Sequence, residues 1–412
     1  MVKFEPIITS LLDTDFYKFT MGQVVYRKYK DVNVKYEFKN RSKVDLYQFI
    51  DLDELKEQLD HIMSLRFNNS ELHYLRGTNE YSDRMFTEDY LDFLKNLRLP
   101  CYDLQHSGSS FSLEFEGPWS TAIYWETFAL SIINELYSRA IFNTGRNFSR
   151  DVFRATGVNN LSNKISWLKR SGNVTFTDFG TRRRFSREWQ DYVVSVMKDE
   201  FSPEQFRGTS NVHLAMKYGL LPMGTSAHEM YMVLAGLAKS DDDIRNSHNS
   251  FLNLWWDQYG YGLSVALTDT FGSDFFFRDM TSWQAAKWKG LRHDSGSPTE
   301  FAKKAISFYE YYGVDSRDKL IVFSDGLDVD TIVGLHDHLE GKIKTTFGWG
   351  TNLTNDVGIK ALSLVVKPTV ANGVGLVKLS DNISKAMGSP SDIERYKRIF
   401  NYTDAYNVEC RY

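Results

Sequence analysis

The stretch KLIVFSDGLDVDTIVGLHDHL, residues 319–339, decides the fold class of this chain. The apolar run 320–323 ends in the polar turn 324–328, and apolar residues at helical spacing follow. A buried strand, a turn and a helix in that order form one β/α unit of a parallel sheet. We therefore look for the same order elsewhere in the chain.

The same order recurs on both sides of this stretch. Seven such segments follow one another: 172–186, 206–219, 221–238, 262–276, 288–313, 319–339 and 342–353. Seven consecutive β/α units favour an α/β barrel over an open sheet. In a barrel, the turns that follow the strands meet at one mouth, so we expect the polar turns of these segments to surround one cavity.

The two ends of the chain carry other patterns. Alternation at 32–38 and 110–118 predicts half-buried strands, and 120–142 predicts one long helix with Ser120 as its N-cap. An earlier helix is expected after residue 15, capped by Asp13 or Asp15. Residues 362–381 predict two strands around an Asn-Gly turn, followed by a short helix. We expect this C-terminal piece to return to the first domain.

Composition narrows the function classes. The 412 residues carry a net charge of -4, which gives no broad attraction to nucleic acid or to an anionic membrane. The chain lacks both a secretory signal pattern and the ~20-residue apolar run of a membrane span. Its two cysteines, Cys101 and Cys410, fit a reducing compartment, so we expect a cytoplasmic protein.

Two glycine-containing turns predict a phosphate site. One turn follows the apolar run at 320–323, and the other is FGWGT at 347–351. Glycine lets the backbone approach an anion closely, and hydroxyl groups add donors. Each turn alone could be an ordinary connection, but two at one barrel mouth favour phosphate binding. The candidates are Ser324, Asp325, Gly326, Gly348, Gly350 and Thr351.

Arg292 and Asp294 stand two residues apart in GLRHDSGSP, so an extended backbone places them on one face. The guanidinium could hold a phosphate, and the carboxylate could bind sugar hydroxyls or a metal ion. The alternative is a surface ion pair.

In TDFGTRRRFS, a flat ring could stack on Phe179 while Arg182 meets its negative substituent. The alternative there is a charged helix start.

His228 lies among small residues in GTSAHEM. It either fills the core as a satisfied buried histidine or carries out chemistry. Asp269, which ends another apolar run, could bind its N–H and fix its tautomer. The chain has neither a GxxxxGK[ST] nucleotide loop nor a GxSxG elbow, so these residues fit neither of those two site types.

Nine motifs together carry a resemblance. They are LLDTDFYKFTM (11–21), TDFGTRRRFS (177–186), GTSN (208–211), GTSAHE (224–229), LTDTFGSDFFFRD (267–279), GLRHDSGSP (290–298), VFSDGLD (322–328), FGWGTNLTND (347–356) and NGVGLVKLSDN (372–382). In this order they resemble the nicotinate phosphoribosyltransferase family, one of the type II phosphoribosyltransferases. The resemblance runs nearly end to end.

This resemblance implies an irregular TIM-like α/β barrel joined to an α/β sandwich built from both chain ends. The sandwich would take residues 1–130 and 360–412, and the barrel 131–359. The implied reaction transfers phosphoribosyl from phosphoribosyl pyrophosphate (PRPP) to nicotinate, with ATP and Mg²⁺, in NAD salvage. No metal ligand is assigned.

The resemblance also implies a role for each candidate residue. ATP would phosphorylate His228, with Asp269 orienting it and Asp294 in the catalytic set. Nicotinate would contact Tyr17, Phe179, Arg182 and Ser210. In the family the tyrosine comes from the neighbouring subunit, so a homodimer is implied. PRPP would contact Arg292, Ser324, Asp325, Gly326, Gly348, Gly350 and Thr351.

Two positions call for comment. The related nicotinamide enzyme has an acid where this chain has Ser210, and an acid there would repel nicotinate. Many relatives have Asp where this chain has Ser297, so a metal or ribose contact is weaker or replaced here.

Two other functions stay open: a glycoside hydrolase using Asp269, Asp294 and Asp325, or a catalytically inactive relative that binds ligands.

Overall fold

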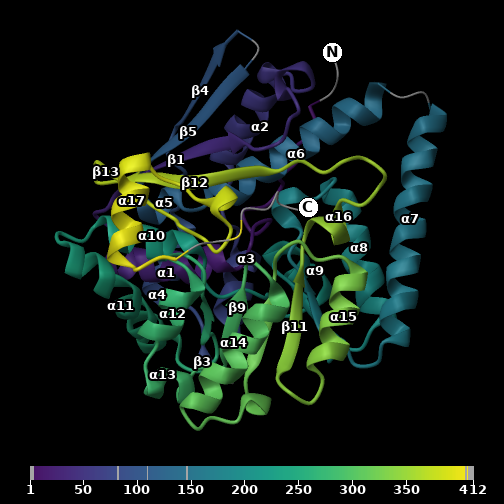
Figure 1. Cartoon of the computed structure of the whole chain (residues 1–412). Helices are drawn as coiled ribbons and strands as arrows, with labels where there is room; N and C mark the ends of the chain where they lie inside the picture. Colours follow the sequence, from purple (N-terminus) through teal and green to yellow (C-terminus); the bar gives the residue numbers. More distant parts are fainter. Residues whose placement is uncertain (1–3, 81–82, 109, 145–146, 404–405, 407–412) are drawn as a thin grey trace.

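The computed structural model describes residues 4–80, 83–108, 110–144, 147–403 and 406. Its strands form a six-stranded sheet, a five-stranded sheet and a small hairpin of β2 (Asn79–Glu80) and β3 (Asp83–Arg84). In Figure 1 the chain ends, in purple and yellow, meet around the five-stranded sheet, and the green strands form the other layer.

The six-stranded sheet is parallel throughout, as the repeated strand-turn-helix order predicts. Its order is β7-β6-β11-β10-β9-β8. The strands are β6 (Phe176–Asp178), β7 (Phe206–Thr209), β8 (Val265–Leu267), β9 (Gly290–His293), β10 (Leu320–Phe323) and β11 (Lys344–Trp349). Because all six run in one direction, the polar turns that follow them share one edge of the sheet.

One of the seven expected strands is missing from the described residues. The segment at 221–225 makes only a single parallel bridge, between Thr209 and Pro222. Proline has no N–H to continue a ladder, which accounts for the loss of this strand. Hydrogen bonds therefore do not close the ring between Pro222 and β8, and the barrel is irregular.

Helices of different lengths connect and follow the strands of this sheet. They are η2 (Thr181–Arg183), α8 (Arg187–Glu200), α9 (Val212–Tyr218), α10 (His228–Gly236), α11 (Asp241–Tyr259), α12 (Ser273–Asp279), α13 (Ser282–Lys287), α14 (Pro298–Tyr311), η3 (Ser316–Asp318), α15 (Val329–Leu339) and α16 (Thr351–Thr354). Side-chain oxygens cap several of them. Asp328, for example, accepts from the N–H of Thr331 at the start of α15.

The five-stranded sheet is antiparallel and joins the two chain ends. Its order is β13-β12-β1-β5-β4, with β1 (Asn33–Asn40), β4 (Tyr102–Ser107), β5 (Ser110–Pro118), β12 (Leu364–Ala371) and β13 (Val374–Gly375). Val34 of β1 pairs with Ala371 of β12, so strands from the two ends of the chain lie side by side in this sheet. The turn residues Asn372 and Gly373 both have positive φ, 46° and 81°, as an Asn-Gly hairpin turn requires.

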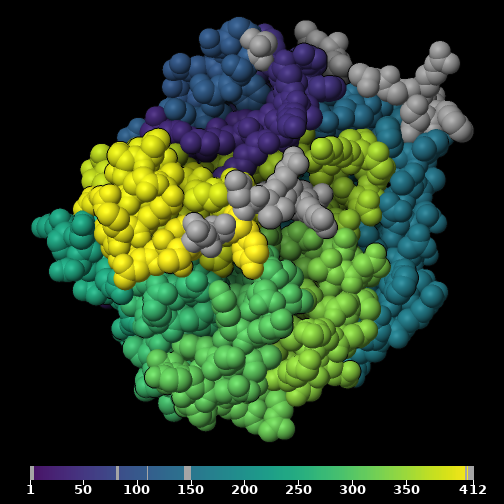
Figure 2. All heavy atoms as spheres, in the orientation of Figure 1, coloured from purple at the N-terminus to yellow at the C-terminus, as the bar shows by residue number. Residues whose placement is uncertain are grey.

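The remaining helices are α1 (Tyr17–Lys28), η1 (Leu46–Gln48), α2 (Leu52–Ser64), α3 (Asn69–Gly77), α4 (Glu88–Lys95), α5 (Trp119–Ala122), α6 (Trp125–Thr144), α7 (Asn147–Arg170), η4 (Ile383–Lys385) and α17 (Pro390–Ile399). Figure 2 shows the yellow C-terminal residues lying between the purple N-terminal part and the green parallel part. Among the described residues, no helix combines the length and the hydropathy that crossing a bilayer requires.

Two local predictions in the N-terminal part are wrong. Neither Asp13 nor Asp15 caps α1, because both side chains turn toward the barrel: Arg184 Nη1 lies 2.6 Å from Asp13 Oδ1, and Ser210 Oγ donates to Asp15. The single helix expected at 120–142 is divided into α5 and α6, and Ser120 lies inside α5. The domain boundary expected at residue 130 falls within α6.

Candidate active site

A cavity at the carboxyl edge of the parallel sheet gathers most of the residues that the sequence singled out. Its lining includes Phe179, Arg182, His228, Arg292, Asp294, Ser324, Asp325, Gly326, Gly348, Gly350 and Thr351. Tyr17 and Ser210 line a second cavity. The two cavities share Phe179, Arg182 and Arg292, so they adjoin. The predicted turns thus do meet at one mouth.

The charge of the first cavity favours an anionic ligand. Seven cationic side chains line it: Arg41, Arg182, Arg183, Arg292, Lys367, Lys378 and Lys385. Four carboxylates stand against them: Glu126, Asp294, Asp325 and Asp328. The excess of positive charge, together with glycine-containing turns, suits a ligand that carries several phosphate charges.

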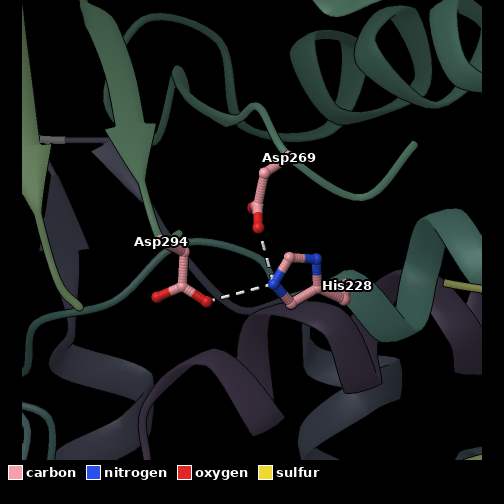
Figure 3. A group of neighbouring side chains, drawn as sticks. All are labelled: His228, Asp269 and Asp294. Atoms are coloured by element: carbon pink, nitrogen blue, oxygen red, sulfur yellow. Dashed lines mark hydrogen bonds and ion pairs between the residues drawn. The ribbon is translucent and has the colours of Figure 1, made fainter. Parts of the chain in front are cut away.

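His228 is the first residue of α10 and is almost fully buried (4% exposed). Its Nδ1 lies 2.9 Å from the hydroxyl oxygen of Thr270, and its Nε2 lies 3.0 Å from Asp294 Oδ2. Figure 3 shows Nε2 directed between Asp294 and Asp269. Both ring nitrogens therefore have polar partners, which holds the ring in one orientation.

Lys378 is a further partner of the imidazole. Its Nζ lies 3.0 Å from Nε2 of His228. An ammonium group only donates and a carboxylate only accepts, so Nε2 either accepts from Lys378 or donates to Asp294. When Nε2 accepts, the ring proton is on Nδ1 and donates to Thr270. In this tautomer Nε2 carries no proton, and its lone pair faces the Lys378 ammonium.

The charge state of these groups follows from burial. Burial first, and then the Lys378 cation, lower the pKa of His228 to about 4, so its ring is neutral at pH 7. Burial also lowers the pKa of Lys378, to about 8. Burial opposes ionisation of Asp294, but Arg292 and His228 outweigh it and hold the pKa of that carboxyl well below its usual range.

Asp269 was expected to orient His228, and its geometry is less direct than that of Asp294. Its Oδ1 lies 3.7 Å from Nε2, beyond hydrogen-bonding distance, and has no hydrogen-bond partner among the described residues. Its Oδ2 accepts from the hydroxyls of Ser295 and Ser380. Of the two carboxylates, Asp294 is the one within hydrogen-bonding distance of Nε2, and it accepts from the imidazole when Nε2 carries the proton.

Arg292, Asp294 and Ser324 form a compact group on neighbouring strands. Arg292 Nε donates to Ser324 Oγ at 2.9 Å, and its Nη2 lies 3.1 Å from Asp294 Oδ1. Ser324 Oγ lies 2.7 Å from the same carboxylate oxygen. The alternative of a surface ion pair is wrong, since both charged groups line the cavity.

Phe179 and Gly348 line both cavities, and Tyr17 lines the second one. Gly348 is required there, because a Cβ on it would lie 2.3 Å from the Phe179 ring. The Arg182 guanidinium lies over the Tyr17 ring, 5.5 Å from its centroid. Tyr17 and Phe179 of this chain line the second cavity together.

Arg182 already contacts carboxylates of its own chain. Its Nε lies 3.1 Å from Asp15 Oδ2, and its Nη1 lies 3.4 Å from Glu126 Oε1. Ser210 Oγ donates to Asp15 Oδ1 at 2.7 Å. Ser210 therefore acts on the Arg182 pocket through Asp15, and its hydroxyl hydrogen is already engaged.

Sequence reasoning missed the lysines of the C-terminal segment. Lys385 Nζ lies 2.5 Å from Asp325 Oδ1 and donates to the carbonyl of Asp294 at 2.9 Å. Lys378 and Lys367 line the same cavity. These lysines carry no local signal, because contacts with residues distant in the sequence bring the C-terminal segment to the cavity.

Ser297, the departure noted above, has a structural role. Its side chain accepts from the N–H of Glu300 and so caps α14. It lines a different, small cavity next to Gly296 and Asp381. A serine in place of aspartate thus keeps the helix cap.

The fold and this site define an α/β enzyme with an anion-binding barrel mouth and a neutral buried histidine. The sequence matches the nicotinate phosphoribosyltransferase (NAPRTase) family over residues 174–404 and its N-terminal domain over residues 12–134. The chain belongs to the nicotinate phosphoribosyltransferase family. The glycoside hydrolase alternative is therefore wrong.

Solved structures agree with this assignment. The chain is 30% identical to a nicotinate phosphoribosyltransferase from Porphyromonas gingivalis, with a TM-score of 0.84 over 96% of this chain and 100% of that one. It is 32% identical to the enzyme of that name from Vibrio cholerae, with a TM-score of 0.86 over 98% of this chain and 95% of that one.

Proposed function

We propose that this enzyme transfers phosphoribosyl from PRPP to nicotinate and uses ATP to phosphorylate His228 during each cycle. The products are nicotinate mononucleotide and pyrophosphate, and the cellular role is NAD salvage. The observation that carries the proposal is the position of Nε2 of His228. This neutral, buried nitrogen faces the cationic cavity that contains both glycine-containing turns.

Nicotinate is assigned to the boundary of the two cavities. The pyridine ring would stack between Phe179 and Tyr17, and Arg182 would meet its carboxylate. Asp15 supports this role because it holds Nε of Arg182 at 3.1 Å and so fixes the guanidinium. The ring nitrogen is already a free nucleophile, so the site needs orientation more than acid–base catalysis.

PRPP is assigned to the turns at 324–326 and 348–351, with Arg292 nearby. The pyridine nitrogen attacks C1 of the ribose, the C1–O bond breaks, and pyrophosphate leaves with the electron pair. Positive charge develops on the sugar, and anionic groups around it stabilise that charge. Asp294 and Asp325 supply two carboxylates at this edge of the sheet.

His228 is assigned as the phosphoryl acceptor. Its Nε2 lone pair forms a bond to the γ-phosphorus of ATP, the P–O bond to ADP breaks, and water later hydrolyses the N–P bond. Lys378, 3.0 Å from Nε2, is placed to neutralise the phosphoryl oxygens. The added charge of up to about -2 beside the cationic cavity would change PRPP and pyrophosphate affinity.

Mg²⁺ does not fit the compact cluster of candidate ligands found among the described residues. His228, Asp269 and Asp294 offer atoms within 4.8 Å of one another, but the Lys378 ammonium lies 3.0 Å from Nε2 and 4.0 Å from Asp269 Oδ2. A cation already stands there, and Mg²⁺ prefers oxygen ligands. We assign Mg²⁺ to the phosphates of ATP and PRPP, as part of the substrates.

We further propose that the enzyme is a cytoplasmic homodimer, as the family resemblance implies. Light scattering at micromolar concentration tests the assembly.

The chemistry is tested by supplying PRPP and nicotinate with and without ATP. We expect nicotinate mononucleotide in both reactions and faster formation with ATP. If neither mixture yields nicotinate mononucleotide, the proposed reaction is wrong, and the chain is a catalytically inactive relative that binds ligands.

A further inference from the structure

Helix α7 (Asn147–Arg170) lies along the outside of the chain segment that contains one of the two phosphate turns (Figure 1). Gly157, Asn160 and Lys164 follow one another at helical spacing on the face that meets this segment. A Cβ on Gly157 would lie 3.0 Å from Val357. Asn160 donates to the carbonyl of Asp356 at 3.1 Å. This face of α7 therefore fits closely against residues 349–358.

Lys164 makes the strongest contacts of this face. Its side chain is 7% exposed, and its Nζ donates to the backbone carbonyl of Asn352. The same ammonium lies 2.7 Å from Asp356 Oδ2 and 5.6 Å from the centroid of the Trp349 ring. Three residues of the segment 349–356 thus converge on a single buried cation, and Trp349 and Asn352 flank Gly350 and Thr351.

The same helix also contacts α15, which begins just after the other phosphate turn at 324–326. α7 therefore packs against the elements that follow both turns. Lys164 itself does not line the cavity, so it acts on a ligand only through the backbone that it holds.

We infer that Lys164 is a positioning residue that fixes the turn 348–351 in its phosphate-binding shape from behind. The inference rests on the proposed binding of PRPP at that turn. A backbone that donates to phosphate must hold its N–H groups in place, and a loosely held turn costs affinity. Removing the ammonium frees the carbonyl of Asn352 and leaves Asp356 without its cation.

The test is Lys164→Met, which keeps the length of the side chain and removes the charge. We expect KM for PRPP to rise by about tenfold, the effect of losing one charged hydrogen bond, with kcat and KM for nicotinate within about twofold. Lys164→Arg should recover part of the PRPP affinity. The matched control is Lys169→Met on the same helix, whose partner Glu200 is exposed, and it should change nothing.

Thr351→Val separates the two possible failures. If it raises KM for PRPP and Lys164→Met does not, the inference about Lys164 is wrong. If Lys164→Met lowers kcat and both affinities in parallel, its role is general stability, which also overturns the inference. If Thr351→Val leaves KM for PRPP unchanged, PRPP does not bind at this turn. The assignment of PRPP in the proposed function is then wrong, whatever Lys164→Met does.

Discussion

The ammonium nitrogen of Lys378 lies 3.0 Å from Nε2 of His228, although 150 residues separate them in the chain. The histidine begins a barrel helix, and the lysine follows the C-terminal hairpin. The pair therefore exists only when the C-terminal segment packs on the barrel. Burial lowers the pKa of the His228 imidazole most, and the Lys378 cation lowers it further because it disfavours a second positive charge beside it.

Replacing His228 tests the phosphoryl step. We expect His228→Ala to abolish stimulation by ATP while slow, ATP-independent transfer continues, since the residues assigned to PRPP and nicotinate remain. Initial rates of nicotinate mononucleotide formation with and without ATP measure this. Unchanged stimulation by ATP in the variant would remove His228 from the mechanism.

Replacing Lys378 tests the role of its charge. We expect Lys378→Met to slow ATP-dependent phosphorylation by about ten- to a hundredfold, because one cation near the transferred group is lost. The matched control is Lys397→Met, an exposed lysine paired with Glu394 on α17. A rate equal to that of the control variant would show that the close contact with Nε2 has no catalytic effect.

The pKa of His228 predicts a pH dependence of stability. In the folded chain this pKa is about 4, below the ordinary value of 6.5, so the unfolded chain binds more protons between these values. The free energy of unfolding therefore falls as pH drops from 6.5 toward 4, by up to about 3 kcal/mol from this residue.

His293, also buried with a pKa lowered to about 4 by desolvation, contributes in the same window. Denaturant titrations at several pH values therefore compare the wild type with His228→Gln. We expect the variant to lose part of the pH dependence and to keep the part due to His293. Equal slopes in the two proteins would mean that His228 is protonated normally.

Substrate choice is tested at Ser210. We expect Ser210→Asp to raise KM for nicotinate by tenfold or more, since a second carboxylate beside Asp15 repels the substrate carboxylate and competes for Arg182. Ser210→Ala, which removes only one hydrogen bond to Asp15, should have a much smaller effect. Equal KM values for the Asp and Ala variants would contradict this explanation.

Gly348 tests the position of the aromatic ring. A Cβ there would lie 2.3 Å from the Phe179 ring, so Gly348→Ala should displace the ring and raise KM for nicotinate by about tenfold. Gly334→Ala in α15 is the control, because nothing lies within 4 Å of its added Cβ. The control should leave KM unchanged and should stabilise the helix by up to about 1 kcal/mol. A normal KM in Gly348→Ala would show that Phe179 does not hold the substrate.

The sequence predicted the parallel units well because each strand and turn is local. LIVF followed by SDGLD is readable without knowledge of any distant residue, and it forms β10 and its turn as expected. The strand expected at 221–225 failed because Pro222 interrupts the ladder, and the caps Asp13 and Asp15 failed because Arg184 and Ser210 bind them across the chain.

The residues of the candidate site, like the strands, were predictable where the signal is local and not where it depends on distant contacts. Residues on the strand turns, such as Arg292 and Gly348, were found because a barrel brings such turns to one mouth. Lys378 and Lys385 were not found, because they lie after β13 and reach the mouth through contacts with distant residues, such as the hydrogen bond from the N–H of Leu379 to the carbonyl of Thr270. The choice of Asp294 over Asp269 as the hydrogen-bond partner of His228 likewise depends on distances of 3.0 and 3.7 Å, which no spacing in the sequence encodes.

The most direct test of the account is mass spectrometry of the intact, full-length enzyme after treatment with ATP and Mg²⁺, kept above neutral pH to preserve an N–P bond. The account predicts one acid-labile phosphate on the peptide that contains His228, and its loss when PRPP and nicotinate are added. ATP-stimulated formation of nicotinate mononucleotide with no phosphate on that peptide at any time would contradict it.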